Sequence, residues 1–262
     1  MEPPHQTPYE EPDREPDAWP REGPGTRPDA RPDAPPYADG PARGRRRPWV
    51  VGVSGASGTP YAAAVLRALL QAGEAVDLVV SRAARLTVLD ETGGPFRDAH
   101  WRADLGRWLA AGADGRPDAF GITEMDLSDV RYWAAGDLAG GPSSGSYAAK
   151  GMIVVPASTA AVAGIALGLS KDLLQRAASV TLKEGRPLVV VVRETPLPGP
   201  TLRQMVALDE AGAAVLPAAP AFYAGATGIQ DLVDFVAGRA LDSAGVPHKL
   251  YRRWEGELGR SR

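Results

Sequence analysis

The chain has 262 residues, with 29 basic and 32 acidic side chains and no cysteine. A near-neutral charge excludes the basic surface typical of nucleic-acid-binding proteins, and the lack of cysteine excludes disulfides and thiolate-bound metals. The sequence shows no secretory signal and no apolar run long enough to cross a membrane, so we expect a cytoplasmic protein.

The N-terminal segment differs in composition from the rest of the chain. Residues 1–48 contain 13 of the 25 prolines and no Leu, Ile or Val. Such a segment cannot bury enough apolar surface to offset the entropy lost on ordering. We therefore predict a disordered Pro-rich tail over 1–48 and one domain over 49–262, long enough to bury a sizeable core.

From Trp49 the sequence alternates strands and helices. An apolar run over 49–54 leads into a glycine-rich turn, and residues 60–72 carry Ala and Leu at helical spacing. A strand over 76–80 and a helix over 83–91 follow. Strand, tight turn, helix and strand in this order predict a parallel sheet.

The second half resumes this alternation after an irregular stretch. Residues 93–146 are broken by Gly and Pro, and we expect a helix near 98–111, one short strand and loops there. Further strands are predicted at 151–155, 187–192 and 213–216, with helices starting near Ser158 and spanning about 172–184, 201–211 and 229–242. The fully apolar strand at 187–192 is typical of a sheet covered on both faces. The pattern predicts an α/β fold: a three-layer, doubly wound sheet of about six mostly parallel strands.

Ligands of such sheets bind beyond the carboxyl ends of the strands. The turn Ser54-Gly-Ala-Ser-Gly58 can present backbone amides to a phosphate, although it can also be a plain turn between a strand and a helix. The chain lacks a full Gly-x-Gly-x-x-Gly pattern, and Ser81 stands where an acidic residue is expected after the second strand. This disfavours a nicotinamide dinucleotide and leaves a mononucleotide open.

Three further polar groups are candidates. Ser158 and Thr159 place hydroxyls at a helix start, where either can also be an ordinary N-cap. Arg176 and Lys183 are seven residues apart, so both can project from one helix face toward a ligand. The same spacing is also found on an ordinary helix face that is exposed to solvent. Arg193-Glu194 follows the apolar strand, where it either reaches the ligand or forms an ordinary polar strand end.

In their order along the chain these pieces resemble the flavin prenyltransferase family, the UbiX-like proteins. The matching segments cover nearly all of 49–255 except the enlarged 93–140 region: Gly-Ala-Ser-Gly, Ser-Arg-Ala-Ala (81–84), Glu-Thr (91–92), Ser-Ser-Gly-Ser (143–146), Pro-Ala-Ser (156–158), Arg-Ala-Ala-Ser-Val-Thr-Leu-Lys-Glu (176–184), Arg-Glu-Thr-Pro-Leu (193–197) and Pro-Ala-Phe-Tyr (220–223). This chain has Pro-Ala-Ser where the family often has Pro-Cys-Ser.

The resemblance implies a Rossmann-like or flavodoxin-like fold and a metal-independent enzyme. It would transfer a dimethylallyl group from dimethylallyl phosphate to N5 and C6 of reduced FMN. The product would be the prenylated-FMN cofactor of a partner decarboxylase. The resemblance also implies a homo-oligomer, a dodecamer with active sites shared between subunits.

The resemblance also assigns roles to individual residues. The implied FMN contacts are Gly55, Ala56, Ser57, Ser81, Ser158, Thr159, Ala160, Ala161 and Arg193. The implied ligands of the prenyl phosphate are Tyr223, Arg239 and Lys183, with Trp254 as an aromatic near the C-terminal closure. Ser57, Glu91, Arg176, Lys183 and Glu194 are the candidate catalytic residues, and either Glu194 or the bound phosphate could accept the C6 proton.

Two other readings compete with this one. FMN-dependent cysteine decarboxylases share the Pro-Ala-Ser element but resemble enzymes with an active-site histidine in the first strand–helix region. Of His5, His100 and His248, only His100 is a conceivable candidate. A non-catalytic FMN-binding protein would not need Lys183, Glu194, Tyr223 and Arg239 together, so their joint presence favours catalysis.

Overall fold

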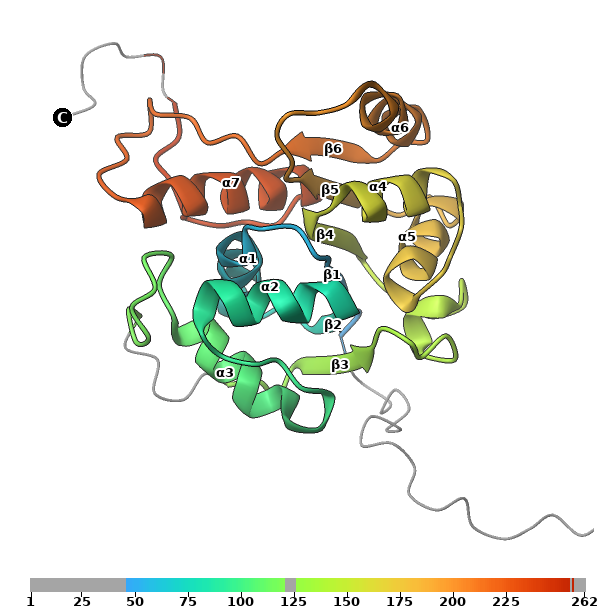
Figure 1. Cartoon of the computed structure of the whole chain (residues 1–262), viewed down its shortest axis with the longest axis horizontal. Helices are drawn as coiled ribbons and strands as arrows, with labels where there is room; N and C mark the ends of the chain where they lie inside the picture. The colour runs from blue at the N-terminus through green and yellow to red at the C-terminus, as the bar shows by residue number, and fades with distance from the viewer. Residues whose placement is uncertain (1–45, 121–125, 255, 257–262) are drawn as a thin grey trace, which may run out of the picture. The chain divides into compact units, whose positions relative to one another are not determined.

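The computed structural model describes residues 46–120, 126–254 and 256 (Figure 1). One sheet has the strand order β3-β2-β1-β4-β5-β6, and every neighbouring pair is parallel. Its strands are β1 (Trp49–Val53), β2 (Val76–Val80), β3 (Val130–Ala134), β4 (Gly151–Ala157), β5 (Leu188–Val192) and β6 (Ala214–Pro217). This is the doubly wound order of dinucleotide-binding folds, so the predicted fold class is confirmed.

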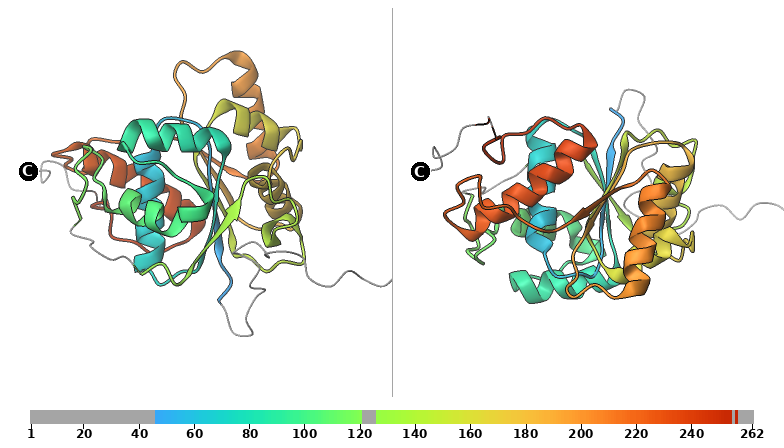
Figure 2. Two further views of the ribbon diagram at one scale, coloured as in Figure 1. Left: turned by 60° about the horizontal axis from the view of Figure 1, so that its bottom comes forward. Right: turned by 90° about the horizontal axis from the view of Figure 1, so that it is seen from above.

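Helices cover both faces of the sheet, as the views in Figure 2 show. One layer contains α1 (Thr59–Gln71), α2 (Arg82–Thr92), α3 (Trp101–Ala110) and α7 (Ile229–Ala244). The other contains α4 (Thr159–Ala166), α5 (Leu173–Lys183) and α6 (Gly199–Glu210). Within the described residues, none of these helices is both long enough and apolar enough to cross a membrane.

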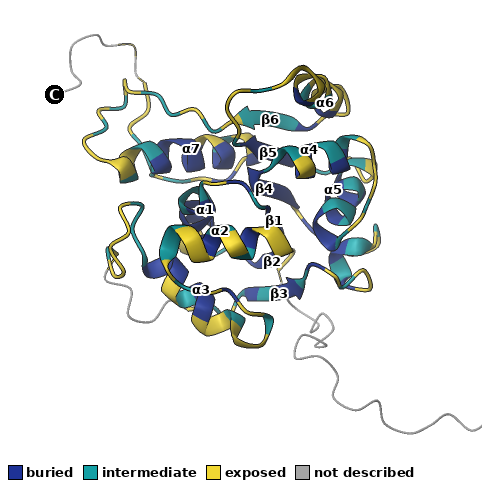
Figure 3. Cartoon of the chain, in the orientation of Figure 1, coloured by how far each residue is buried: buried dark blue, intermediate teal, exposed yellow. Residues whose placement is uncertain are grey.

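Two hydrophobic cores lie on opposite faces of the sheet. Side chains alternate along a strand, so in β5 Val189 and Val191 pack in the core under α1 and α7, while Val190 and Val192 pack in the core under α4 and α5. Figure 3 shows the central strands buried throughout. The uninterrupted apolar run of β5 follows from burial on both sides.

The start of the domain and the middle of the chain refine the sequence predictions. Residues 1–45 of the predicted tail lie outside the described residues. Pro48 is buried, and its carbonyl accepts a hydrogen bond from the Lys150 amide at 2.9 Å, so the folded part includes Pro48. The helix predicted at 98–111 is a 3₁₀ turn (Asp98–His100) followed by α3, and β3 is the short strand expected in this region.

The region after α2 packs around one buried carboxylate. The Asp104 side chain is fully buried, and it accepts hydrogen bonds from the Arg97 amide (2.9 Å), Nε (2.9 Å) and Nη2 (2.8 Å) as well as from Arg107. Hydrogen bonds from Arg97 hold the pKa of Asp104 at about 2, although burial opposes this. Nearby, the buried Arg67 of α1 donates to the Leu109 carbonyl at 2.9 Å and so ties α1 to α3.

Candidate active site

The site begins where the chain order of the sheet reverses, between β1 and β4. Ser54, which is buried directly after β1, donates its hydroxyl proton to the Pro156 carbonyl at 2.8 Å. The same hydroxyl oxygen accepts the Ser158 amide at 2.7 Å. One side chain therefore fixes the spacing of the two strand ends at the crevice where such folds bind ligands.

The turn after β1 fits tightly against α2. A Cβ on Gly55 would lie 2.4 Å from the Ala83 Cβ, so only glycine is tolerated there. Gly58 has φ 111°, a left-handed conformation that favours glycine. Within the described part of the chain, the amides of 55–57 donate to no protein acceptor. Successive amides without acceptors are suited to bind an anion.

The N-terminus of α1 already has an acceptor, the carboxylate of Glu91 at the end of α2. Its oxygens accept hydrogen bonds from the Gly58 amide (2.8 Å), the Thr59 amide (2.7 Å) and the Thr59 hydroxyl (2.6 Å). Burial raises the pKa of Glu91, but these hydrogen bonds and one from Ser57 outweigh it and hold the pKa below its usual value. Glu91 is therefore an anionic helix cap that links α2 to the turn.

Three of the predicted flavin contacts are placed at helix starts. Ser81 caps α2 by accepting the Ala84 amide at 3.1 Å, and Ser158 caps α4 by accepting the Ala161 amide at 3.3 Å. The N-cap interpretation of Ser158 is thus correct, and the residue directly follows the end of β4. Thr159 begins α4, whereas the Ala161 side chain packs in the core beneath that helix.

Arg193 follows β5 and points back toward the turn after β1. Its amide donates to the Ala157 carbonyl at 3.1 Å, and its side chain lies beside Gly58. Within the described residues, its Nε is buried without a hydrogen-bond partner. A buried, unpaired guanidinium N–H is costly unless a ligand completes it, so an anionic group such as a flavin phosphate fits this position. Glu194 beside it is exposed.

A cavity of about 450 Å³ lies next to this cluster. Its walls come from the turn (Ser57, Gly58), from α1 and α2 (Tyr61, Glu91) and from the start of α7. Burial raises the pKa of Tyr61, and Arg193 opposes the shift while Glu91 adds to it.

The residues predicted to bind the prenyl phosphate and its five-carbon group lie together in a second cluster, which contains Tyr223, Arg239 and Trp254. The Tyr223 ring lies 5.9 Å from the Trp254 ring and 5.7 Å from the Phe235 ring, in edge-to-face contacts. Arg239 joins this group through Tyr251, whose hydroxyl lies 3.4 Å from Nη1 and whose ring contacts Phe235. The loop after β6, which contains Tyr223, lies at the same edge of the sheet as Ser158 and Arg193.

Lys183 and Arg176 do not join either cluster within one chain. Lys183 ends α5 and precedes the turn into the start of β5, whereas Arg193 follows the end of β5. At about 3.3 Å per residue the two edges of the sheet are roughly 20 Å apart. Lys183 instead pairs with Glu184, and the Arg176 Nε donates to the Ser143 carbonyl at 3.0 Å.

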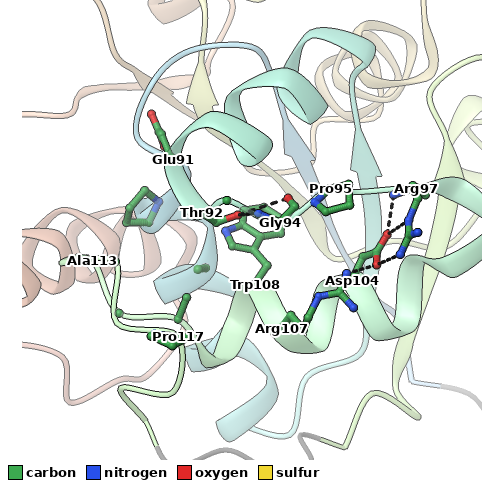
Figure 4. Close-up of a pocket in the computed structure, with 16 residues that line it drawn as sticks. Glu91, Thr92, Gly94, Pro95, Arg97, Asp104, Arg107, Trp108, Ala113 and Pro117 are labelled. Atoms are coloured by element: carbon green, nitrogen blue, oxygen red, sulfur yellow. Dashed lines mark hydrogen bonds and ion pairs between the residues drawn. The ribbon is translucent and has the colours of Figure 1, made fainter.

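The enlarged region after α2 adjoins the site. A cavity of about 430 Å³ shares Pro60, Glu91 and Ala113 with the cavity described above. Figure 4 shows Glu91 on one side of Trp108 and the Arg97–Asp104–Arg107 cluster on the other. The insertion therefore borders the candidate active site through Glu91.

Sequence reasoning passed over two residues of this site, Thr59 and Tyr61, and it included Ser54 in the candidate turn without giving it a role. The position of Ser54 directly after β1 is the signal that points to it, because strand ends line the crevice. The contact of Thr59 with Glu91 joins residues 32 apart and leaves no local pattern. The histidine alternative gains no support: His100 is exposed in a 3₁₀ turn, and His248 binds Asp242.

Comparisons with known proteins agree with these features. The family model described as "Flavoprotein" matches residues 41–241. The chain is 77% identical to the flavin prenyltransferase UbiX of Streptomyces coelicolor over 215 residues, which cover 82% of this chain and 98% of that protein. It is 42% identical over 205 residues to the flavin prenyltransferase UbiX of Deinococcus radiodurans, covering 78% and 92%.

Solved structures give the same result. The crystal structure of AnUbiX (PadA1) in complex with FMN and dimethylallyl pyrophosphate matches with a TM-score of 0.68 and 36% identity, covering 81% of this chain and 100% of that chain. A dodecameric FMN-dependent UbiX-like decarboxylase from Escherichia coli O157:H7 matches with a TM-score of 0.66 and 36% identity, covering 79% and 99%. The chain belongs to the flavoprotein family and, within it, to the flavin prenyltransferases.

Proposed function

We propose that this enzyme transfers a dimethylallyl group from dimethylallyl phosphate to N5 and C6 of reduced FMN, and that a partner decarboxylase uses the product. The high identity to a flavin prenyltransferase supports the reaction class. The observation that carries the proposal is the buried, unpaired Nε of Arg193 beside acceptor-free amides and a cavity. This combination suits a ligand with an anionic end and a ring system.

The flavin phosphate is held by the amides of 55–57 and by Arg193, with Ser81 and Ser158 at the neighbouring strand ends. Reduced FMN supplies the two nucleophilic ring atoms. The turn and α4 orient the ring system, because Ser54 fixes their separation. Glu91 stays anionic and keeps the turn in place.

The donor is held by the aromatic cluster and by cations. Tyr223 and Trp254 provide a wall for the five-carbon group, and such rings stabilise positive charge on allylic carbons by cation–π interaction. Arg239 and Lys183 bind the leaving phosphate, where preorganised charge is most effective as the C–O bond breaks. N5 loses its proton as it bonds the primary carbon, and the prenyl double bond takes up a proton as C6 bonds the tertiary carbon. The proton that C6 then loses passes to Glu194 or to the released phosphate.

Lys183 acts in this proposal on the site of a neighbouring copy. Its own chain places it at the opposite edge of the sheet from Arg193 and Glu194, so a complete site needs an oligomer. The dodecameric state of the related protein from Escherichia coli supports this arrangement. A complementation experiment tests it: Lys183→Ala and Arg193→Ala chains should each be strongly impaired, but a co-assembled equal mixture should regain about a quarter of the wild-type activity. Absence of any recovery in verified mixed oligomers would contradict a shared site.

The reaction itself is tested by mass spectrometry. The full chain is incubated without oxygen with reduced FMN, dimethylallyl phosphate and a metal chelator, and the released flavin should gain one dimethylallyl unit. Unchanged flavin together with loss of CO₂ from a peptide with a C-terminal cysteine would favour the decarboxylase alternative. Unchanged flavin and unchanged peptide would favour a binding protein without catalytic activity.

A further inference from the structure

Asp242, near the end of α7, gathers four side chains around one carboxylate. It accepts hydrogen bonds from the Tyr251 hydroxyl (2.5 Å), Arg253 Nη2 (2.6 Å) and Arg239 Nη1 (3.1 Å), and its Oδ1 lies 3.0 Å from His248 Nε2. Three of these partners belong to the segment 247–254 that follows α7. Asp242 therefore ties this segment to the helix that carries Arg239.

The helix surface is shaped to receive the segment. A Cβ on Gly238 would lie 2.6 Å from the Tyr251 ring and 2.7 Å from the His248 ring. Only a glycine lets these rings rest on the helix backbone one turn before Asp242. The His248 side chain is 2% exposed. The segment is thus packed onto α7 and is not merely adjacent to it.

A series of aromatic contacts connects the packed segment to Tyr223 and Trp254, the predicted ligands of the prenyl donor. Tyr251 contacts Phe235 with ring centroids 4.9 Å apart, Phe235 contacts Tyr223, and Tyr223 contacts Trp254 near the end of the same segment. Tyr223 and Trp254 are 44% and 54% exposed, so the ring faces remain open on one side. The position of this wall depends on where the segment is held.

The charges of the cluster leave Arg239 able to bind an anion. Burial raises the pKa of Asp242, but hydrogen bonds from Arg253, Tyr251 and His248 outweigh it and hold the pKa at about 2. One carboxylate therefore faces two guanidinium groups, and the cluster stays cationic at neutral pH. Among the described residues, Arg239 uses Nη1 for its protein contacts, and its other nitrogens have no protein acceptor.

We propose that Asp242 is a positioning residue for the prenyl donor: it locks the segment 247–254 onto α7, and so sets Arg239 and the Tyr223–Trp254 wall for a small allylic phosphate. The proposal rests on the proposed function for the identity of the ligand. The lock itself is a property of the chain and can be measured without catalysis.

Asp242→Asn and Tyr251→Phe test the lock in the full chain. The first removes the charge at constant shape. The second removes one hydroxyl and keeps the ring contact with Phe235. Lys249→Gln is the matched control, because it changes an exposed charge in the same segment without touching Asp242.

Both variants should speed amide hydrogen exchange of residues 248–253 by roughly tenfold or more, the behaviour of a locally loosened segment. The KM for dimethylallyl phosphate should rise about tenfold, the kcat should change less than about threefold, and FMN affinity should remain as in the wild type. Lys249→Gln should match the wild type in all four measurements.

Wild-type exchange rates and an unchanged KM in both variants would overturn the proposal. Faster exchange with an unchanged KM would also overturn it, because the lock would then not position the donor ligands. If Asp242→Asn fails to fold, Tyr251→Phe decides, since it deletes one oxygen atom. If the wild type itself does not prenylate FMN, the proposed function fails, while the exchange data still decide whether the lock exists.

Discussion

The contact of Glu91 with the start of α1 can be tested by Glu91→Gln, which keeps the shape of the side chain and removes its charge. Glu91 accepts three hydrogen bonds of 2.6–2.8 Å from Gly58 and Thr59. A hydrogen bond to a charged group stabilises more than a neutral one by about 0.5–1.5 kcal/mol. The side chain is half-buried, so solvent screens part of this, and the net cost should be about 1–2 kcal/mol, the usual cost of losing a helix cap.

The assay is thermal and urea unfolding of flavin-free protein over a range of pH. At pH 7 the variant should melt about 2–8 °C below the wild type. The pKa of Glu91 is lowered in the folded state from an ordinary 4.5, so its stabilisation is present above that value and is lost as the pH falls through the folded pKa. The difference between the two proteins should therefore shrink below about pH 4.

Glu210→Gln on the exposed end of α6 is the matched control and should unfold as the wild type does. A Glu91→Gln protein as stable as this control at pH 7 would refute the assignment of Glu91 as a helix cap. A difference that persists undiminished at pH 3 would refute the electrostatic part of the reasoning.

Three further predictions concern other parts of the molecule. Lys183→Ala should slow single-turnover prenyl transfer by roughly a hundredfold and change FMN affinity less than about tenfold; loss of FMN binding with normal turnover of the saturated protein would contradict the role of Lys183. Asp104→Asn should cost about 2–3 kcal/mol at neutral pH, because the NH2 group of the buried amide cannot accept the hydrogen bonds that the carboxylate receives from Arg97 and Arg107. Asp104 has a folded pKa of about 2 against an ordinary 3.8, so its stabilisation should vanish as the pH falls toward 2, and equal pH profiles of variant and wild type would contradict this. Deleting residues 1–45 should leave the Tm unchanged, whereas deleting 1–48 should lower it by about 2–4 °C, because the Lys150 amide loses the Pro48 carbonyl and Asp129 loses Arg46. Equal Tm values for both truncations would show that residues 46–48 do not stabilise the fold.

The sheet could be predicted because its strands carry an unambiguous local signal. β2 and β5 are short runs dominated by Val between turn residues, and their observed bounds match the prediction closely. The structure of the region between α2 and β4 was harder to predict, because contacts between residues far apart in the sequence organise it. Arg67 bonding Leu109, and Asp104 held by Arg97, depend on the fold and leave no periodic pattern in the sequence.

The site could be predicted in part for the same reason. Ser158 and Arg193 follow strands, and parallel topology brings such residues to one edge. Family resemblance groups Lys183 with Glu194 by their roles. The direction of α5, however, places Lys183 at the opposite edge of the sheet from Glu194. The grouping and this placement agree if each active site takes Lys183 from a neighbouring copy, as we propose. Asp242 carries no motif, so its four partners emerge only when the segment after α7 folds back.

The hydroxyl of Ser54 has a consequence for the timing of binding and release. From the end of β1 it donates to the Pro156 carbonyl and accepts from the Ser158 amide, both at the end of β4, so two bonds between protein groups tie these strand ends together. The floor of the crevice is therefore preorganised before any ligand arrives, so little conformational entropy is lost there when flavin binds. The same rigidity holds the product as firmly as the substrate, since both present the same phosphate. We expect departure of the finished cofactor to depend on opening of the loop after β6 and of the C-terminal segment, while the floor stays unchanged.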